Sequence, residues 1–164
     1  MEGLAFDCPC CGKRYADLPA VVFDGPAVTG DVDMQGADFC VLDSEHFFVR
    51  TVLTVPIIGK AMPMEWGVWS SLSGTNFQIY KDAYASTDRA ALGTMFSYLG
   101  NEIPGYSGSL ALRSRIHPQN DRQRPFVEFD PSQEHPLVRA QTEGITLDRA
   151  IELIMPVLHP QGRA

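Results

Sequence analysis

The sequence has no long uninterrupted apolar run, which argues against a membrane span. A helix that crosses a bilayer needs about 20 apolar residues, whereas the most apolar segment, residues 47–58, is interrupted by Arg50 and Pro56. The first residues are acidic and lack the basic flank and apolar stretch of a signal peptide. We therefore expect a cytoplasmic protein, in which cysteines are thiols or metal ligands and not disulfides.

Positive charge is also scarce. The chain has 13 Lys and Arg against 20 Asp and Glu, a net charge of −7, so we expect it to bind neither nucleic acid nor anionic membranes. Residues 15–49 contain seven acids and no Lys or Arg, whereas residues 113–124 contain four arginines and one acid. The acidic N-terminal third is either a solvated surface or a contact region for another protein.

Familiar catalytic motifs are missing as well. The sequence has no G-x-S-x-G, no H-E-x-x-H, no glycine-rich phosphate loop and no G-x-G-x-x-G. Repeats, low-complexity tracts and linkers are also absent. These absences favour one domain over residues 1–164 that is a binding module and not an enzyme.

What is present predicts an α+β fold. With 45% apolar and 20% charged residues, the 164-residue chain can build an ordinary core. We expect an irregular, Cys-containing N-terminal segment (residues 1–36), a mostly β region (37–130) and a helical region (131–164). Strands followed by helices predict an antiparallel sheet of about five strands with the C-terminal helices packed on one face.

Individual elements follow from periodicity and from capping residues. β-branched and aromatic residues predict a hairpin of residues 46–55 and 65–72, with Trp66 and Trp69 on opposite faces. Ser73 is a predicted N-cap for a short helix, and Thr146 for a helix reaching residue 158. A further helix should begin near Pro136 and end at Gly144. Other strands are expected at residues 110–116 and 126–129, while residues 95–103 fit a strand or a loop and residues 23–36 an irregular loop.

The most specific local motif is Cys8-Pro9-Cys10-Cys11-Gly12. Cys8 and Cys11 form half of a zinc-binding turn, in which two thiolates converge and the glycine permits a tight backbone. No second C-x-x-C exists, so Cys40 and one of His46, His117, His135 and His159 would have to complete a zinc site. Reduced, partly buried cysteines are the alternative. A thiol-redox role is a third reading, although Gly12 and Pro19 leave no room for the long helix of glutaredoxin-like proteins.

A second group of residues could bind an anion. Arg113, Arg115 and His117 alternate along one predicted strand and so share a face, and an arginine row can bind a carboxylate or phosphate. The same row could be the solvated face of a sheet. If a pocket exists, we expect one of the tryptophans to line it together with basic residues. The candidates are Trp66, Trp69, Arg113, Arg115, His117, Arg124 and His135.

Several short motifs follow one another along the chain: Phe6-x-Cys8-x-x-Cys11-Gly12, Phe39-Cys40, His46-Phe47-Phe48-Val49-Arg50, Trp66-Gly67-Val68-Trp69, Leu99-Gly100-Asn101, Arg124-Pro125, His135-Pro136-Leu137 and Gly144-Ile145. In this order they resemble a bacterial family, domain of unknown function 2199. The resemblance implies a bacterial cytosolic protein and no established activity. One departure is Thr51, where the family pattern leads us to expect glycine after Arg50, so a glycine-dependent bulge there is in doubt.

Overall fold

The computed structural model describes residues 4–159. In chain order the elements are β1 (Phe6–Asp7), β2 (Arg14–Tyr15), β3 (Val21–Val22), β4 (Val32–Gln35), β5 (Phe39–Leu42), β6 (His46–Val55), β7 (Met64–Leu72), α1 (Gly74–Asp82), the short 3-10 helix η1 (Arg89–Leu92), β8 (Met95–Leu99), β9 (Arg113–His117), β10 (Phe126–Phe129), α2 (Pro136–Glu143) and α3 (Leu147–Leu158). None of the helices in this part of the chain combines the length and apolarity needed to cross a membrane.

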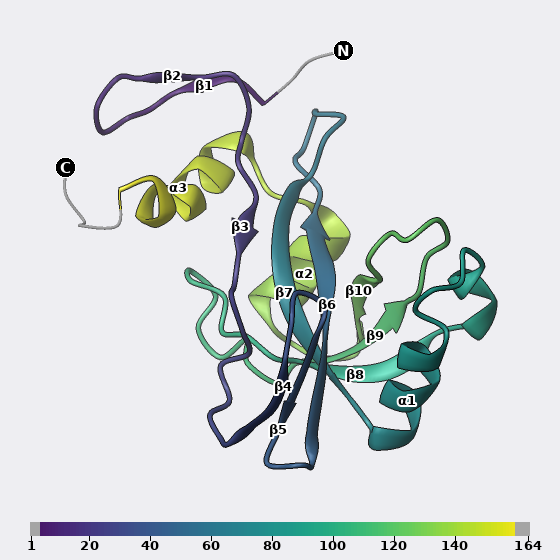
Figure 1. Cartoon of the computed structure of the whole chain (residues 1–164). Helices are drawn as coiled ribbons and strands as arrows, with labels where there is room; N and C mark the ends of the chain where they lie inside the picture. Colours follow the sequence, from purple (N-terminus) through teal and green to yellow (C-terminus); the bar gives the residue numbers. More distant parts are fainter. Residues whose placement is uncertain (1–3, 160–164) are drawn as a thin grey trace.

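The β6–β7 hairpin is the centre of the fold (Figure 1). Its antiparallel register runs from Phe47 opposite Leu72 to Val55 opposite Met64. The predicted hairpin is therefore confirmed, and Trp66 and Trp69 do lie on opposite faces. The register continues through Thr51 without a shift, so β6 contains no bulge at the position where glycine was expected.

The α+β class is confirmed, but the expected antiparallel sheet of about five strands is not the one that forms. Strands β6 to β10 follow one another in antiparallel pairs, except that β10 also pairs in parallel with β6, with Phe126 opposite Val52. This last pairing closes five strands into a barrel. Alternation predicts which side chains share a face, but it does not report which strands are neighbours, so the closure left no signal in the sequence.

Further strands extend the barrel sheet beyond β6 and β7. β5 pairs with β6, and β4 pairs with β5, both antiparallel, while β3 lies parallel to β7. β1 and β2 form a separate small hairpin. The N-terminal segment of residues 1–36 is thus less irregular than expected where the structure describes it, and β4 lies inside the predicted loop of residues 23–36.

The barrel interior holds two apolar clusters separated by hydroxyl groups. Thr51 Oγ1 lies 2.9 Å from Ser70 Oγ, and Ser97 Oγ lies 2.7 Å from Ser114 Oγ, all four residues being buried. Because buried hydroxyls need hydrogen-bond partners, the pairs satisfy each other across neighbouring strands. One apolar cluster lies toward α1 and the other toward α2 and α3.

The helices begin where their capping residues predict. The Ser73 hydroxyl accepts a hydrogen bond from Asn76 N, and the Thr146 hydroxyl accepts one from Arg149 N. Pro136 is the first residue of α2, and Gly144 ends it with a φ of 85°. The C-terminal helices contribute to the cluster at one end of the barrel, and α1 contributes to the cluster at the other. The C-terminal helices and α1 therefore pack against different apolar clusters of the barrel.

Candidate metal centre

The β1–β2 hairpin presents the C-x-x-C motif on its turn. Cys8 N donates to Lys13 O at 2.8 Å, and Gly12 N donates to Cys8 O at 2.9 Å. Gly12 has a φ of 77°, a left-handed conformation that a glycine adopts without steric cost. The stacked rings of Phe6 and Tyr15, 5.2 Å apart, fix the strands behind the turn. Local sequence alone therefore directs both thiols to one side of the turn.

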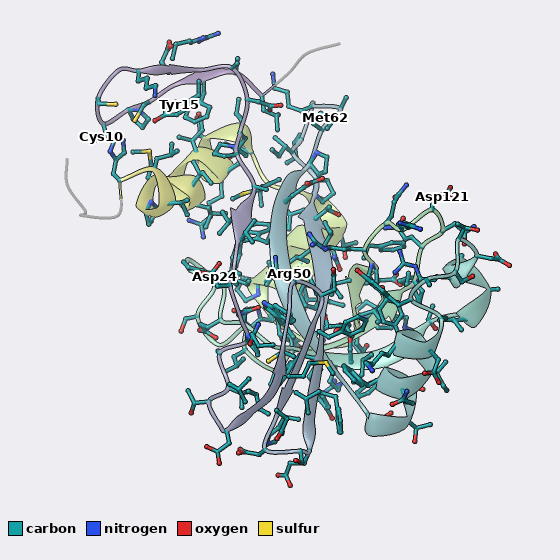
Figure 2. All side chains as sticks on the ribbon, viewed as in Figure 1. Cys10, Tyr15, Asp24, Arg50, Met62 and Asp121 are labelled. Carbon is teal, nitrogen blue, oxygen red and sulfur yellow. The ribbon has the colours of Figure 1, made fainter. Side chains whose placement is uncertain are left out.

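The C-terminal end of α3 brings a histidine to these thiols. His159 is the C-cap residue, and its backbone N donates to Met155 O. Its Nε2 lies 3.2 Å from Cys8 Sγ and 3.9 Å from Cys11 Sγ, and the three atoms all lie within 4.8 Å of one another. Figure 1 shows the hairpin lying alongside α3, and Figure 2 labels Cys10 at its turn, close to the helix end.

The surroundings of Cys8 favour its thiolate. Burial of this residue opposes ionisation, but hydrogen bonds from the backbone of Cys11, from His159 and from the backbone of Cys10 outweigh it and lower the pKa of the Cys8 thiol to about 7. The backbone N–H of Cys10 lies 3.4 Å from Cys8 Sγ. A thiolate is the form of cysteine that binds metals.

The donor set and its dimensions fit zinc. Zinc binds thiolate sulfur at about 2.3 Å and imidazole nitrogen at about 2.0–2.1 Å with tetrahedral geometry. A sulfur and a nitrogen bound to the same zinc ion are then about 3.6 Å apart. The two sulfur–nitrogen distances of 3.2 and 3.9 Å lie on either side of this value. Cys8, Cys11 and His159 therefore supply three donors that a zinc ion could share with little movement.

Cys40, which was expected in this site, lies elsewhere. It is on β5, where its Sγ donates to Gln35 Oε1 at 3.2 Å, and burial raises the pKa of its thiol. It packs with Leu42, Phe48 and Trp69 in a small apolar cluster. Sequence reasoning left the histidine open among four candidates, and only His159 lies with Cys8 and Cys11 in the part of the chain that is described.

The two tryptophans are buried in different places. Trp66 points into the barrel, and Trp69 lies outside it beneath Arg50, whose guanidinium is 4.7 Å from the ring. The Trp69 indole N–H donates to Phe23 O at 3.0 Å. Both side chains therefore belong to packed cores, and neither lines the anion pocket that the sequence suggested.

The remaining residues of that expected pocket also have separate partners. Arg113 pairs with Asp130 at 3.6 Å, and His117 pairs with Glu128 at 2.8 Å. His135 accepts from Leu137 N at the start of α2 and contacts Ser107 O with its other ring nitrogen. Arg115 lines a cavity of about 260 Å³ together with Phe96, whereas Arg124 lines a larger cleft and binds Asp38. The structure thus does not assemble the predicted group.

Fold and site together define an α+β barrel protein with a Cys2His group suited to zinc. The chain belongs to the DUF2199 family, described as an uncharacterized protein conserved in bacteria, with residues 7–145 matched. The match includes Cys8 and Cys11 and ends before His159. No curated protein and no solved structure matches the chain significantly.

Proposed function

We propose that this protein is a non-enzymatic binding domain of the bacterial cytosol, in which a zinc ion fastens the N-terminal hairpin to the C-terminal helix. The convergence of Cys8, Cys11 and His159 is the observation that carries the zinc link, and the lack of the familiar catalytic motifs in the sequence supports a binding role. The free state of all four cysteines is compatible with a reducing compartment.

A tethering role fits the position of the three donors. Cys8 and His159 are 151 residues apart in sequence, so one ion would cross-link two distant parts of the chain. Leu4 and Phe6 already pack in the same cluster as Leu153 and Ile154. Zinc would then add metal–ligand bonds to this apolar contact, and metal binding of this kind contributes directly to folding free energy.

Elemental analysis of protein from zinc-replete expression tests the proposal. We expect about one zinc per chain, lost in Cys8→Ser, Cys11→Ser and His159→Gln. Cys10→Ser is the matched control, because Cys10 is exposed and is outside the three-residue group, and it should keep the metal. A chain without zinc, or variants that retain it as well as the control does, would contradict the site.

The pH dependence of zinc binding gives a second measurement. Protons compete with the metal for the Cys8 thiolate, whose pKa in the metal-free protein is about 7. Zinc affinity should therefore fall as the pH decreases below about 7. Competition with a chromogenic chelator at several pH values measures this directly, and an affinity independent of pH between 5 and 8 would argue against a thiolate ligand.

A protein partner for the acidic N-terminal third is a second candidate function. Asp31, Asp33, Asp43 and Glu45 are exposed near β4, the strand that ends the described sheet. An edge strand with unpaired backbone groups can accept a strand from another protein. Capture from a bacterial lysate should be lost at high salt and in Asp33→Asn, and capture that is indifferent to both would refute this role.

A further inference from the structure

A cleft of about 640 Å³ lies on the outside of the barrel, away from the cysteine site. It is bounded by the outer face of β6, by Tyr84 and η1, and by the loop between β9 and β10, where Figure 2 labels Asp121. Its volume is in the range of small-molecule sites. The charged side chains that line it are Arg89, Arg122, Arg124, Asp38 and Glu65, a net positive group in a chain with a charge of −7.

Arg89 is the most unusual of these residues, because it is only 2% exposed. Its Nη1 donates to Tyr80 OH at 3.1 Å and its Nη2 to Gln123 O at 3.3 Å, both neutral acceptors. Its Nε is buried without a hydrogen-bond partner, and no carboxylate of the described residues forms an ion pair with it. The guanidinium also lies over the rings of Tyr80 and Tyr84, 5.7 and 5.0 Å from their centroids, and these contacts compensate its charge only in part. A buried cation without a counter-charge is costly, so this guanidinium is suited to receive an anion.

Asp38, one of the two acids that line the cleft, is already engaged elsewhere. Asp38 accepts a hydrogen bond from Tyr84 OH at 2.6 Å and one from Arg124 Nε at 2.8 Å. These contacts, with the charges of Arg124 and Arg50, outweigh burial and lower the pKa of the Asp38 carboxyl. Asp38 therefore neutralises Arg124 and is not available to Arg89 or Arg122.

The loop that carries Arg122 is held in a demanding conformation. Asp121 and Arg122 have φ values of 57° and 64°, in the left-handed region that non-glycine residues rarely adopt. Asn120 Oδ1 accepts from Ala90 N at 2.8 Å, and Asp121 N donates to Thr87 O at 3.0 Å. One side-chain and one backbone hydrogen bond thus fix the loop against residues 87–90, at the start of η1. Strained backbone of this kind is frequent at ligand sites.

We infer that this cleft binds a small molecule with a phosphate group, held by Arg89 and Arg122. Guanidinium groups match phosphate oxygens in geometry and charge. Phe126, which lines the same cleft and is 41% exposed, offers apolar surface to the rest of the ligand. The site shares no residue with the cysteine group, so the inference does not rest on the proposed zinc.

Calorimetric titration with phenyl phosphate, inorganic phosphate and benzoate, at fixed ionic strength and pH, tests the inference. We expect saturable binding of phenyl phosphate, weaker binding of inorganic phosphate and the weakest binding of benzoate. Arg122→Gln should reduce the affinity for phenyl phosphate by about tenfold, the loss typical of a charged hydrogen bond. Arg139→Gln removes the same charge from an exposed position of α2 outside the cleft, and it should bind like the unmodified protein.

Each other outcome overturns the inference. If neither phosphate shows saturable binding, the cleft is not a phosphate site. If benzoate binds more tightly than phenyl phosphate, the cleft prefers a carboxylate to a phosphate. An equal loss in Arg122→Gln and Arg139→Gln would indicate a non-specific charge effect. Zinc content and phenyl phosphate binding are separate measurements on the unmodified protein, so failure of the zinc proposal and failure of this one are distinguishable.

Discussion

Gly105 is the position where a single methyl group should disturb the candidate metal centre from a distance. Its φ is 89°, and a Cβ atom placed on it would overlap Cδ2 of Leu153 on α3. The same loop also binds this helix through Arg149, whose Nη2 donates to Gly105 O at 3.0 Å. Gly105→Ala should therefore push against α3, which ends at the residue before His159.

The loss of stability that we expect in Gly105→Ala has two parts, and a matched variant separates them. A left-handed φ costs an alanine about 1–2 kcal/mol, and forcing a methyl group into a packed core costs about 1–3 kcal/mol more. Gly59 also has a positive φ, 78°, and holds the same position in its turn as Gly105, because Lys60 N donates to Ile57 O as Tyr106 N donates to Ile103 O. A Cβ atom at Gly59 meets nothing within 4 Å, so Gly59→Ala should show only the backbone cost, and Gly105→Ala both.

Denaturant unfolding measures the stabilities, and chelator competition measures zinc affinity in the same two variants. We expect Gly105→Ala to be less stable than Gly59→Ala by about 1–3 kcal/mol. It should also bind zinc about tenfold more weakly, because displaced supporting structure misorients a metal ligand, whereas Gly59→Ala should bind zinc normally. Equal stability losses in the two variants would refute the packing of α3 against this loop, whatever the metal result.

Two further predictions concern groups inside the fold. Thr51→Val leaves the Ser70 hydroxyl buried without its partner at 2.9 Å and should lower the free energy of unfolding by about 1–3 kcal/mol. Adding Ser70→Ala should recover part of that loss. Strict additivity of the two substitutions in thermal unfolding would contradict the pairing. The Asp38 carboxyl has a lowered pKa in the folded protein. Its contribution to stability is therefore complete above its pKa in the unfolded chain, and it disappears as the pH falls through its pKa in the folded protein. Asp38→Asn should flatten this acid limb of the pH–stability curve, and an unchanged limb would assign the limb to other carboxyl groups.

Local sequence patterns predicted the elements better than their arrangement. Ser73, Thr146 and Gly144 fixed the helix ends because capping depends on neighbouring residues. Alternation likewise placed Trp66 and Trp69 on opposite faces. The parallel pairing of β10 with β6 joins residues 126 and 52, and such distant contacts have no local signature, so the barrel was not predicted. Arg89 was missed for the same reason, since its burial depends on Tyr80 and on the carbonyl of Gln123.

The candidate metal centre combines both kinds of information. The turn that carries Cys8 and Cys11 is specified within a few residues, by Gly12 and by the pairing of β1 with β2. The third donor depends on where α3 ends, and this in turn depends on the packing of Leu153 and Ile154 into the cluster at one end of the barrel. Half of the site is thus a local motif and the other half a product of the whole fold. This explains why the sequence indicated the cysteines clearly, but could only include His159 among four possible histidines.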